Sequence, residues 1–95
     1  MSPHKVAIVT GAGQGIGLAI GWALAHRQML VVIADIDLTL AEQAAAAISR
    51  EGLLAVARHV DVAQRESVEA MVASVIEEFG RITGIVTRHD VLEFL

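Results

Sequence analysis

The 95-residue sequence has no cysteine and no tyrosine, a single proline and a single lysine, Lys5. The lack of cysteine excludes disulfides, thiolate metal ligands and cysteine nucleophiles. Aromatic residues are also scarce, with one tryptophan and two phenylalanines, although 55% of the residues are hydrophobic. The core must therefore be built from Val, Ile, Leu and Ala, as in a sheet covered by helices.

Clustered positive charge and long apolar runs are absent as well. The net charge is −4 and the seven Lys and Arg residues are scattered, so we expect no nucleic-acid or membrane partner. The longest unbroken apolar run, 29–34, is far below the roughly 18 residues that span a bilayer. The apolar stretch before Gly11 is too short for a signal peptide. We expect a cytoplasmic protein, and the four histidines show no metal-ligand spacing.

What the sequence does contain is a regular alternation of two patterns. Short apolar runs, typical of buried strands, cover residues 5–10, 30–34, 54–60 and 82–86. Between them lie helical stripes, at Ile16, Ile20, Ala23 and Leu24, then within 40–48, then within 68–79. Gly52 and Gly80 are expected to end the second and third helices. The order β-α-β-α-β-α-β predicts an α/β fold with a parallel sheet.

A glycine-rich segment, Thr10-Gly-Ala-Gly-Gln-Gly-Ile-Gly17, joins the first strand to the first helix. Glycines there allow a tight turn and a close approach of the backbone to a pyrophosphate, which the helix N-terminus attracts. Asp35 ends the next strand, where a carboxylate can accept hydrogen bonds from ribose hydroxyls. The alternative is a turn that needs glycines but binds nothing. The ordered context of strand, turn, helix, strand and acid favours a dinucleotide site.

The pattern Thr-Gly-x-x-x-Gly-Ile-Gly resembles that of the short-chain dehydrogenase/reductase family. The resemblance continues through residues 34–37, 60–62 and 78–86. It implies a Rossmann-like fold, here a partial doubly wound parallel sheet with strand order 3-2-1-4. It also implies an NAD(P)-dependent oxidoreductase acting on alcohols or carbonyls, usually as a dimer or tetramer.

The same resemblance assigns cofactor contacts by position. Those at the phosphates and the adjoining ribose are Gly11, Gln14, Gly15, Ile16 and Gly17, those at the adenosine ribose are Asp35 and Ile36, and those at the adenine are Asp61 and Val62. An alternative for Asp61 is to cap the third helix, since its spacing to Gln64 resembles a capping box. The Asp35 carboxylate would repel a 2′-phosphate, so NAD is the expected cofactor.

The resemblance breaks after the fourth strand. The family continues with Asn-Asn-Ala-Gly, where this sequence has Thr87-Arg-His-Asp90. The family's catalytic Ser, Tyr and Lys have no counterparts, so no catalytic residue is assigned. We expect residues 1–95 to form a single truncated dinucleotide-binding domain that is inactive alone.

The alternative is a non-catalytic interaction module. It would self-associate, or dock on a related full-length subunit, through the sheet edge and the apolar tail 91–95. Because one helix must cover the second face of the sheet, we expect part of the apolar first and second strands to meet water.

A further expectation concerns Gln28, where the family usually has a glycine. A left-handed backbone at Gln28 would cost about 1 kcal/mol relative to glycine.

Overall fold

A computed structural model gives the structure of the chain and describes residues 4–87. Its elements are β1 (Val6–Thr10), α1 (Gly15–His26), β2 (Leu30–Asp35), α2 (Leu38–Arg50), β3 (Ala55–His59), α3 (Arg65–Phe79) and β4 (Gly84–Val86). Strands and helices alternate as predicted, and the chain has an α/β fold. The tail 91–95, to which the sequence assigns a possible contact, lies outside the described residues.

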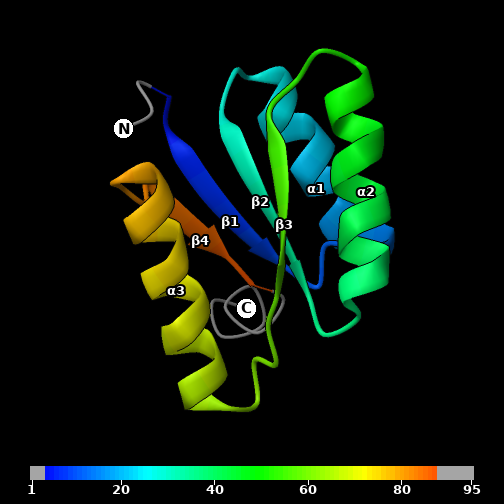
Figure 1. Ribbon diagram of the computed structural model, residues 1–95. Coiled ribbons are helices and arrows are strands. Elements are labelled where there is room, and N and C mark those ends of the chain that lie inside the picture. Colours follow the sequence, from blue (N-terminus) through cyan, green and yellow to red (C-terminus); the bar gives the residue numbers. More distant parts are fainter. Residues whose placement is uncertain (1–3, 88–95) are drawn as a thin grey trace, which may run out of the picture.

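The four strands form one parallel sheet in the order β3-β2-β1-β4, which confirms the predicted order 3-2-1-4. Helices α1 and α2 lie on one face of the sheet and α3 lies on the other (Figure 1). This arrangement is Rossmann-like. All four strands run in the same direction, so their carboxyl ends meet at one edge of the sheet.

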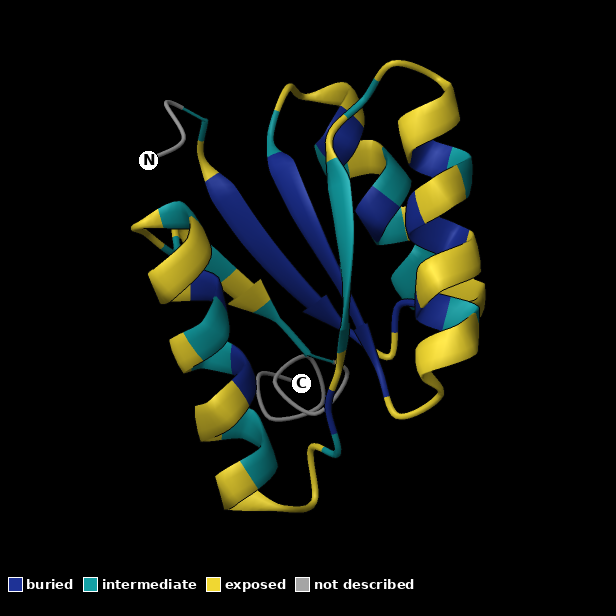
Figure 2. Cartoon of the chain, viewed as in Figure 1, coloured by how far each residue is buried: buried dark blue, intermediate teal, exposed yellow. Residues whose placement is uncertain are grey.

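The core has two layers, one on each face of the sheet, and β1 and β2 contribute to both. Val9, Val31 and Ile33 point toward α1 and α2, whereas Ile8 and Val32 point toward α3. Figure 2 shows β1 and β2 buried along their whole length. The expectation that part of these strands meets water is therefore wrong. The single helix α3 covers them because its Met71 and Val75 seal the second layer.

Exposed sheet surface falls instead on the two outer strands. All of β3 is at most half-buried, and Ile85 of β4 has 42% of its surface exposed. Ile85 is the register partner of Ile8, which is fully buried. The difference arises because α3 reaches over β1 and β2 but leaves Ile85 of β4 partly open.

The predicted stripe of α1 is right for two of its four residues. Ile20 and Leu24 pack against the core, but Ile16 and Ala23 are exposed, and the fully buried residues of the helix are Gly21 and Ala25. Almost every residue of α1 is apolar or glycine, so periodicity could not identify the buried face. Packing identifies it: a Cβ at Gly21 would lie 2.8 Å from Cδ1 of Ile33, so the helix approaches β2 through its smallest residue.

Each of the three helices within residues 4–87 is followed by a residue with a left-handed backbone. Gly52 (φ +80°) follows α2 and Gly80 (φ +81°) caps α3, as predicted. Gln28 follows α1 with φ +66°, a conformation that L side chains rarely adopt. Gln28 therefore has the left-handed backbone that was considered from the sequence, and a strained turn connects α1 to β2.

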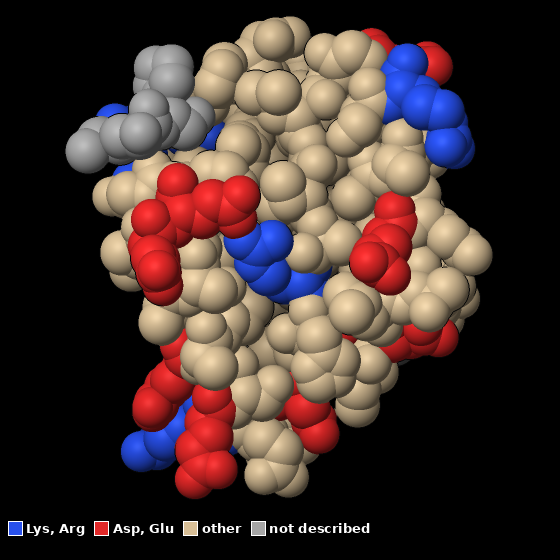
Figure 3. Space-filling model, viewed as in Figure 1, with Lys and Arg blue, Asp and Glu red and all other residues tan. Residues whose placement is uncertain are grey.

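Charged side chains are distributed unevenly over the surface. In the view of Figure 3, acidic groups gather over α3, and the basic groups form no continuous stripe. No helix within residues 4–87 has the length and apolar character needed to cross a membrane. In the same range, no three His, Asp or Glu side chains converge in a way that could hold a metal ion.

Candidate nucleotide-binding site

The turn between β1 and α1 lies at the carboxyl edge of the sheet, and its glycines have distinct roles. Gly17 is held against the turn, since a Cβ there would lie 2.3 Å from the Gly11 carbonyl oxygen. Gly11 (φ +62°) and Gly15 (φ +64°) adopt left-handed backbones, and a Cβ at either would meet nothing within 4 Å. The turn therefore folds tightly on itself and leaves bare backbone facing open space.

The first turn of α1 faces the same space without a protein cap. Its N-cap residue, Gln14, makes no side-chain capping hydrogen bond, and the first turn contains no acidic residue. The opening N–H groups of an α-helix have no intrahelical acceptors, and the helix dipole places partial positive charge there. This end of α1 is suited to an anionic group such as a phosphate.

Asp35 supplies the negative group of the site. It ends β2 and is 9% exposed, and both of its carboxylate oxygens accept backbone hydrogen bonds. Gly13 N–H donates to Oδ2 at 2.9 Å, and Asp37 N–H donates to Oδ1 at 3.0 Å. A carboxylate has about four acceptor positions, so two remain for hydroxyl groups of a ligand.

These groups surround one cavity of about 670 Å³ at the carboxyl edge of the sheet. The cavity brings together six of the nine predicted contacts, namely Gly11, Gln14, Gly15, Ile16, Gly17 and Asp35. Val9, Thr10, Ile20, Val86 and Thr87 line it as well, and sequence reasoning missed them. Their position at strand ends and on the turn-facing side of α1 is the only signal that could have indicated them. Ile16, in the cavity wall, is 80% exposed.

The other three predicted contacts lie around the cavity rather than in its wall. Ile36 follows Asp35 and is 64% exposed. Val62 is 58% exposed and lines a second cavity of about 470 Å³. The two cavities share Thr10 and Thr87, so they adjoin at the ends of β1 and β4.

Asp61 lines neither cavity and does not cap α3. The N-cap of α3 is Gln64, whereas the Asp61 carboxylate accepts the N–H of Ala63 at 3.0 Å. The capping-box interpretation is therefore wrong. Asp61 instead shapes the turn from β3 to α3, and its own N–H donates to Ser67 Oγ at 2.8 Å. Its contact with adenine stays a prediction.

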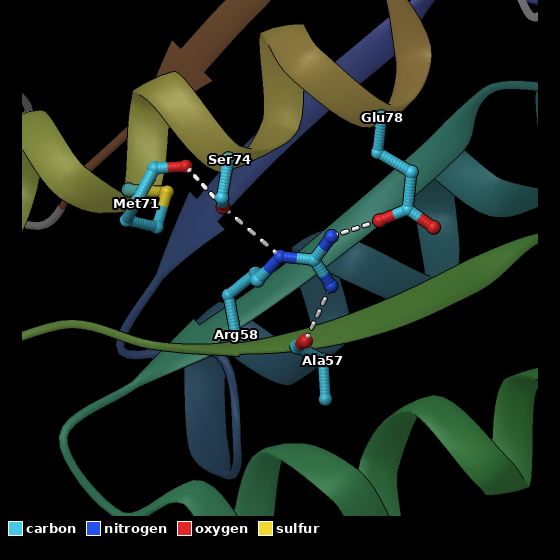
Figure 4. Close-up of polar contacts among 5 residues, drawn as sticks. All are labelled: Ala57, Arg58, Met71, Ser74 and Glu78. Atoms are coloured by element: carbon cyan, nitrogen blue, oxygen red, sulfur yellow. Dashed lines mark hydrogen bonds and ion pairs between the residues drawn. The ribbon is translucent and has the colours of Figure 1, made fainter.

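A polar cluster ties β3 to α3 away from the cavity (Figure 4). Arg58 on β3 donates to Ser74 Oγ at 3.2 Å and forms an ion pair with Glu78, both on α3. It also donates to the carbonyl of Ala57 at 3.0 Å. The glutamate face of α3 is thus partly engaged by β3.

Comparison with known proteins agrees with this architecture. A family model described as short chain dehydrogenase matches residues 5–88. Galactitol 2-dehydrogenase of Agrobacterium fabrum is 41% identical over 90 residues, which are 95% of this chain and 34% of that protein. The 2-(S)-hydroxypropyl-CoM dehydrogenase 3 of Xanthobacter autotrophicus is 34% identical over 96% of this chain and 36% of that protein.

Solved structures give the same result. The crystal structure of hydroxysteroid dehydrogenase from Escherichia coli superposes with a TM-score of 0.85 at 31% identity, covering 87% of this chain and 35% of that one. Fold and sequence together define a Rossmann-like unit of the dehydrogenase type found in these relatives. The chain belongs to the short-chain dehydrogenase/reductase family, and it spans about a third of the length of the curated relatives it matches.

Proposed function

We propose that this chain is the NAD-binding N-terminal portion of a short-chain dehydrogenase/reductase oxidoreductase. The observation that carries the proposal is the single cavity that joins the uncapped start of α1 to the Asp35 carboxylate. A dinucleotide needs both features at once, because its pyrophosphate is anionic and its ribose hydroxyls are donors. Its phosphates would lie at Gly11, Gln14, Gly15, Ile16 and Gly17, with Asp35 and Ile36 at the adenosine ribose and Asp61 and Val62 at the adenine.

The preference for NAD over NADP rests on Asp35. A 2′-phosphate in place of the ribose hydroxyl would bring negative charge against a buried carboxylate. The flanking Gln14 and Ile36 are uncharged and offer no compensating cation. NAD should therefore bind more tightly by about 1–3 kcal/mol, the scale of a buried polar mismatch.

Calorimetric titration of the purified chain with NAD and with NADP tests this preference. Asp35→Asn should reduce the difference in affinity between NAD and NADP. The asparagine amide is uncharged, and only one of its two terminal atoms accepts hydrogen bonds. The matched control is Asp37→Asn, which removes the same charge two residues away. That carboxylate caps α2 through Leu40 N–H at 3.1 Å, a role that asparagine also fills. Equal or tighter binding of NADP by the unaltered chain would refute the preference.

We further propose that the 95 residues alone do not catalyse oxidation or reduction. The sequence has no tyrosine, and its single lysine, Lys5, immediately precedes β1. General acid–base assistance contributes about 10²–10⁴ in rate, so its loss should be plain in an assay with alcohols and carbonyls. Saturable NAD-dependent turnover by the pure chain would contradict this. The cytoplasmic location expected from the sequence stays a prediction.

A second candidate function, an interaction module, is favoured by one observation. Among residues 4–87, β4 forms one edge of the sheet, and its Ile85 is 42% exposed beside an apolar second cavity. An unpaired parallel edge presents free N–H and C=O groups to another chain. Light scattering over a concentration series should show self-association that Ile85→Lys reduces. A monodisperse monomer at every concentration, with NAD bound, would leave only the first function.

A further inference from the structure

Asp35, in the cavity wall, forms a closed ring of contacts with Gly13, Asp37 and Leu40. Gly13 N–H donates to Asp35 Oδ2 and Asp37 N–H donates to Oδ1. The Asp37 carboxylate in turn accepts Leu40 N–H at the start of α2. Leu40 closes the ring, because its Cβ lies 2.8 Å from the point that a Cβ on Gly13 would occupy.

We propose that Gly13 is a positioning residue that sets the cofactor preference by holding Asp35 in one orientation. The proposal rests on the proposed NAD-binding function and adds a determinant outside the cavity wall, since Gly13 does not line the cavity. Gly13 acts in two ways. Its N–H anchors one carboxylate oxygen, and its missing Cβ leaves room for that oxygen and for Leu40.

A methyl group added at position 13 would meet two neighbours. A Cβ at position 13 would lie 2.9 Å from Asp35 Oδ2 and 2.8 Å from Leu40 Cβ. The Asp35 carboxylate can rotate about two side-chain bonds and so relieve the first contact. The Leu40 Cβ is fixed to the backbone of α2, so the second contact is relieved only by a small shift of the turn relative to α2. Rotation of the carboxylate breaks the hydrogen bond from Gly13 and turns its free acceptor positions away from the ligand.

The backbone at Gly13 makes this substitution a clean test. Gly11 and Gly15 have positive φ, so alanine there would be strained regardless of space, but Gly13 has no positive φ. Alanine at 13 therefore changes packing and not backbone preference. Gly84 offers a matched control, since it also lacks a positive φ and a Cβ there would meet nothing within 4 Å.

The experiment titrates the unaltered 95-residue chain, Gly13→Ala and Gly84→Ala with NAD and with NADP by calorimetry. Gly13→Ala should weaken NAD binding about tenfold, the scale of one hydrogen bond, and change NADP binding much less. The NAD-to-NADP affinity ratio should therefore fall about tenfold. Gly84→Ala should keep the ratio of the unaltered chain. A merely structural role for Gly13 would weaken both cofactors equally and leave the ratio unchanged.

If circular dichroism shows that Gly13→Ala does not fold, a second variant tests whether the orientation of the Asp35 carboxylate sets the cofactor preference. Asp35→Glu keeps the charge, but the longer side chain cannot keep both backbone hydrogen bonds in the same geometry. The ratio should fall here too, and an unchanged ratio would overturn the proposal. If the unaltered chain prefers NAD and folded Gly13→Ala keeps that preference, this inference fails while the proposed function stands. If the unaltered chain binds neither cofactor, the proposed function itself fails.

Discussion

The inner and the outer strands of the same sheet differ in how completely they are closed to water. In the inner strands, β1 and β2, every residue is buried. In the outer strands, β3 and β4, which lie at opposite edges, every residue is half-buried or exposed. The inner strands also lead into the glycine turn and end at Asp35, whereas the outer strand β3 is fastened to α3 by the polar Arg58 cluster. Apolar burial thus supports the cavity, and polar contacts hold the periphery.

The largest effect should come from comparing Ile8 with its register partner Ile85. Ile8→Ala removes a fully buried side chain and should lower the free energy of unfolding by about 4 kcal/mol. Ile85→Ala, at a 42% exposed position, should cost less than about 1 kcal/mol. Urea denaturation of both variants measures the difference. Similar costs would mean that β4 is buried in solution, as in self-association, and a dependence on protein concentration would then show it.

A second comparison concerns two glycines of the sheet and its turn. Gly17→Ala places a methyl group against the backbone of Gly11 and Ala12, which cannot rotate away, and should cost about 3 kcal/mol and abolish NAD binding. Gly84→Ala meets open space and should change stability little. Thermal melts and calorimetry provide the measurements. Normal NAD binding by Gly17→Ala would show that the turn has more freedom than its contacts indicate.

The polar link between β3 and α3 should have a smaller effect. Arg58→Met keeps the aliphatic stem but loses the ion pair with Glu78 and the hydrogen bond to Ser74, and should cost about 1 kcal/mol. Part of this cost should vanish at high salt because Glu78 is half-exposed. The matched control is Arg81→Met, at an exposed position. An equal effect of both substitutions in urea denaturation would exclude a specific role for the cluster.

The smallest effect is a gain of stability at the turn that leads into the inner strand β2. Gln28→Gly relieves a left-handed backbone at φ +66° and should add about 0.5–1 kcal/mol to the free energy of unfolding. Gln43→Gly, at an exposed right-handed position of α2, should instead remove about 1 kcal/mol. Melting temperatures that move in the same direction for both variants would contradict the assignment of strain to Gln28.

Sequence reasoning succeeded where a local signal was strong. The alternation of apolar runs with helical stripes predicted all seven elements, and Gly52 and Gly80 marked helix ends because only glycine readily adopts φ near +80°. It failed for half of the α1 stripe, Ile16 and Ala23, because the nearly uniform apolar composition of this helix has no distinct face. It also failed for the Asp61 capping box, because Ser67 and Ala63 compete for the backbone and carboxylate of Asp61.

The sequence by itself determined the fold class and the glycine turn, since these depend on patterns within short segments, and its resemblance to a known family supplied the order of the strands. Only the tertiary structure decided that α3 closes the second face of β1 and β2, and that Gly13, Asp35, Asp37 and Leu40 meet. Such contacts join residues far apart in the chain, here 22 positions between Gly13 and Asp35. No local pattern encodes a distance of that kind, because it is set by how the helices pack on the finished sheet.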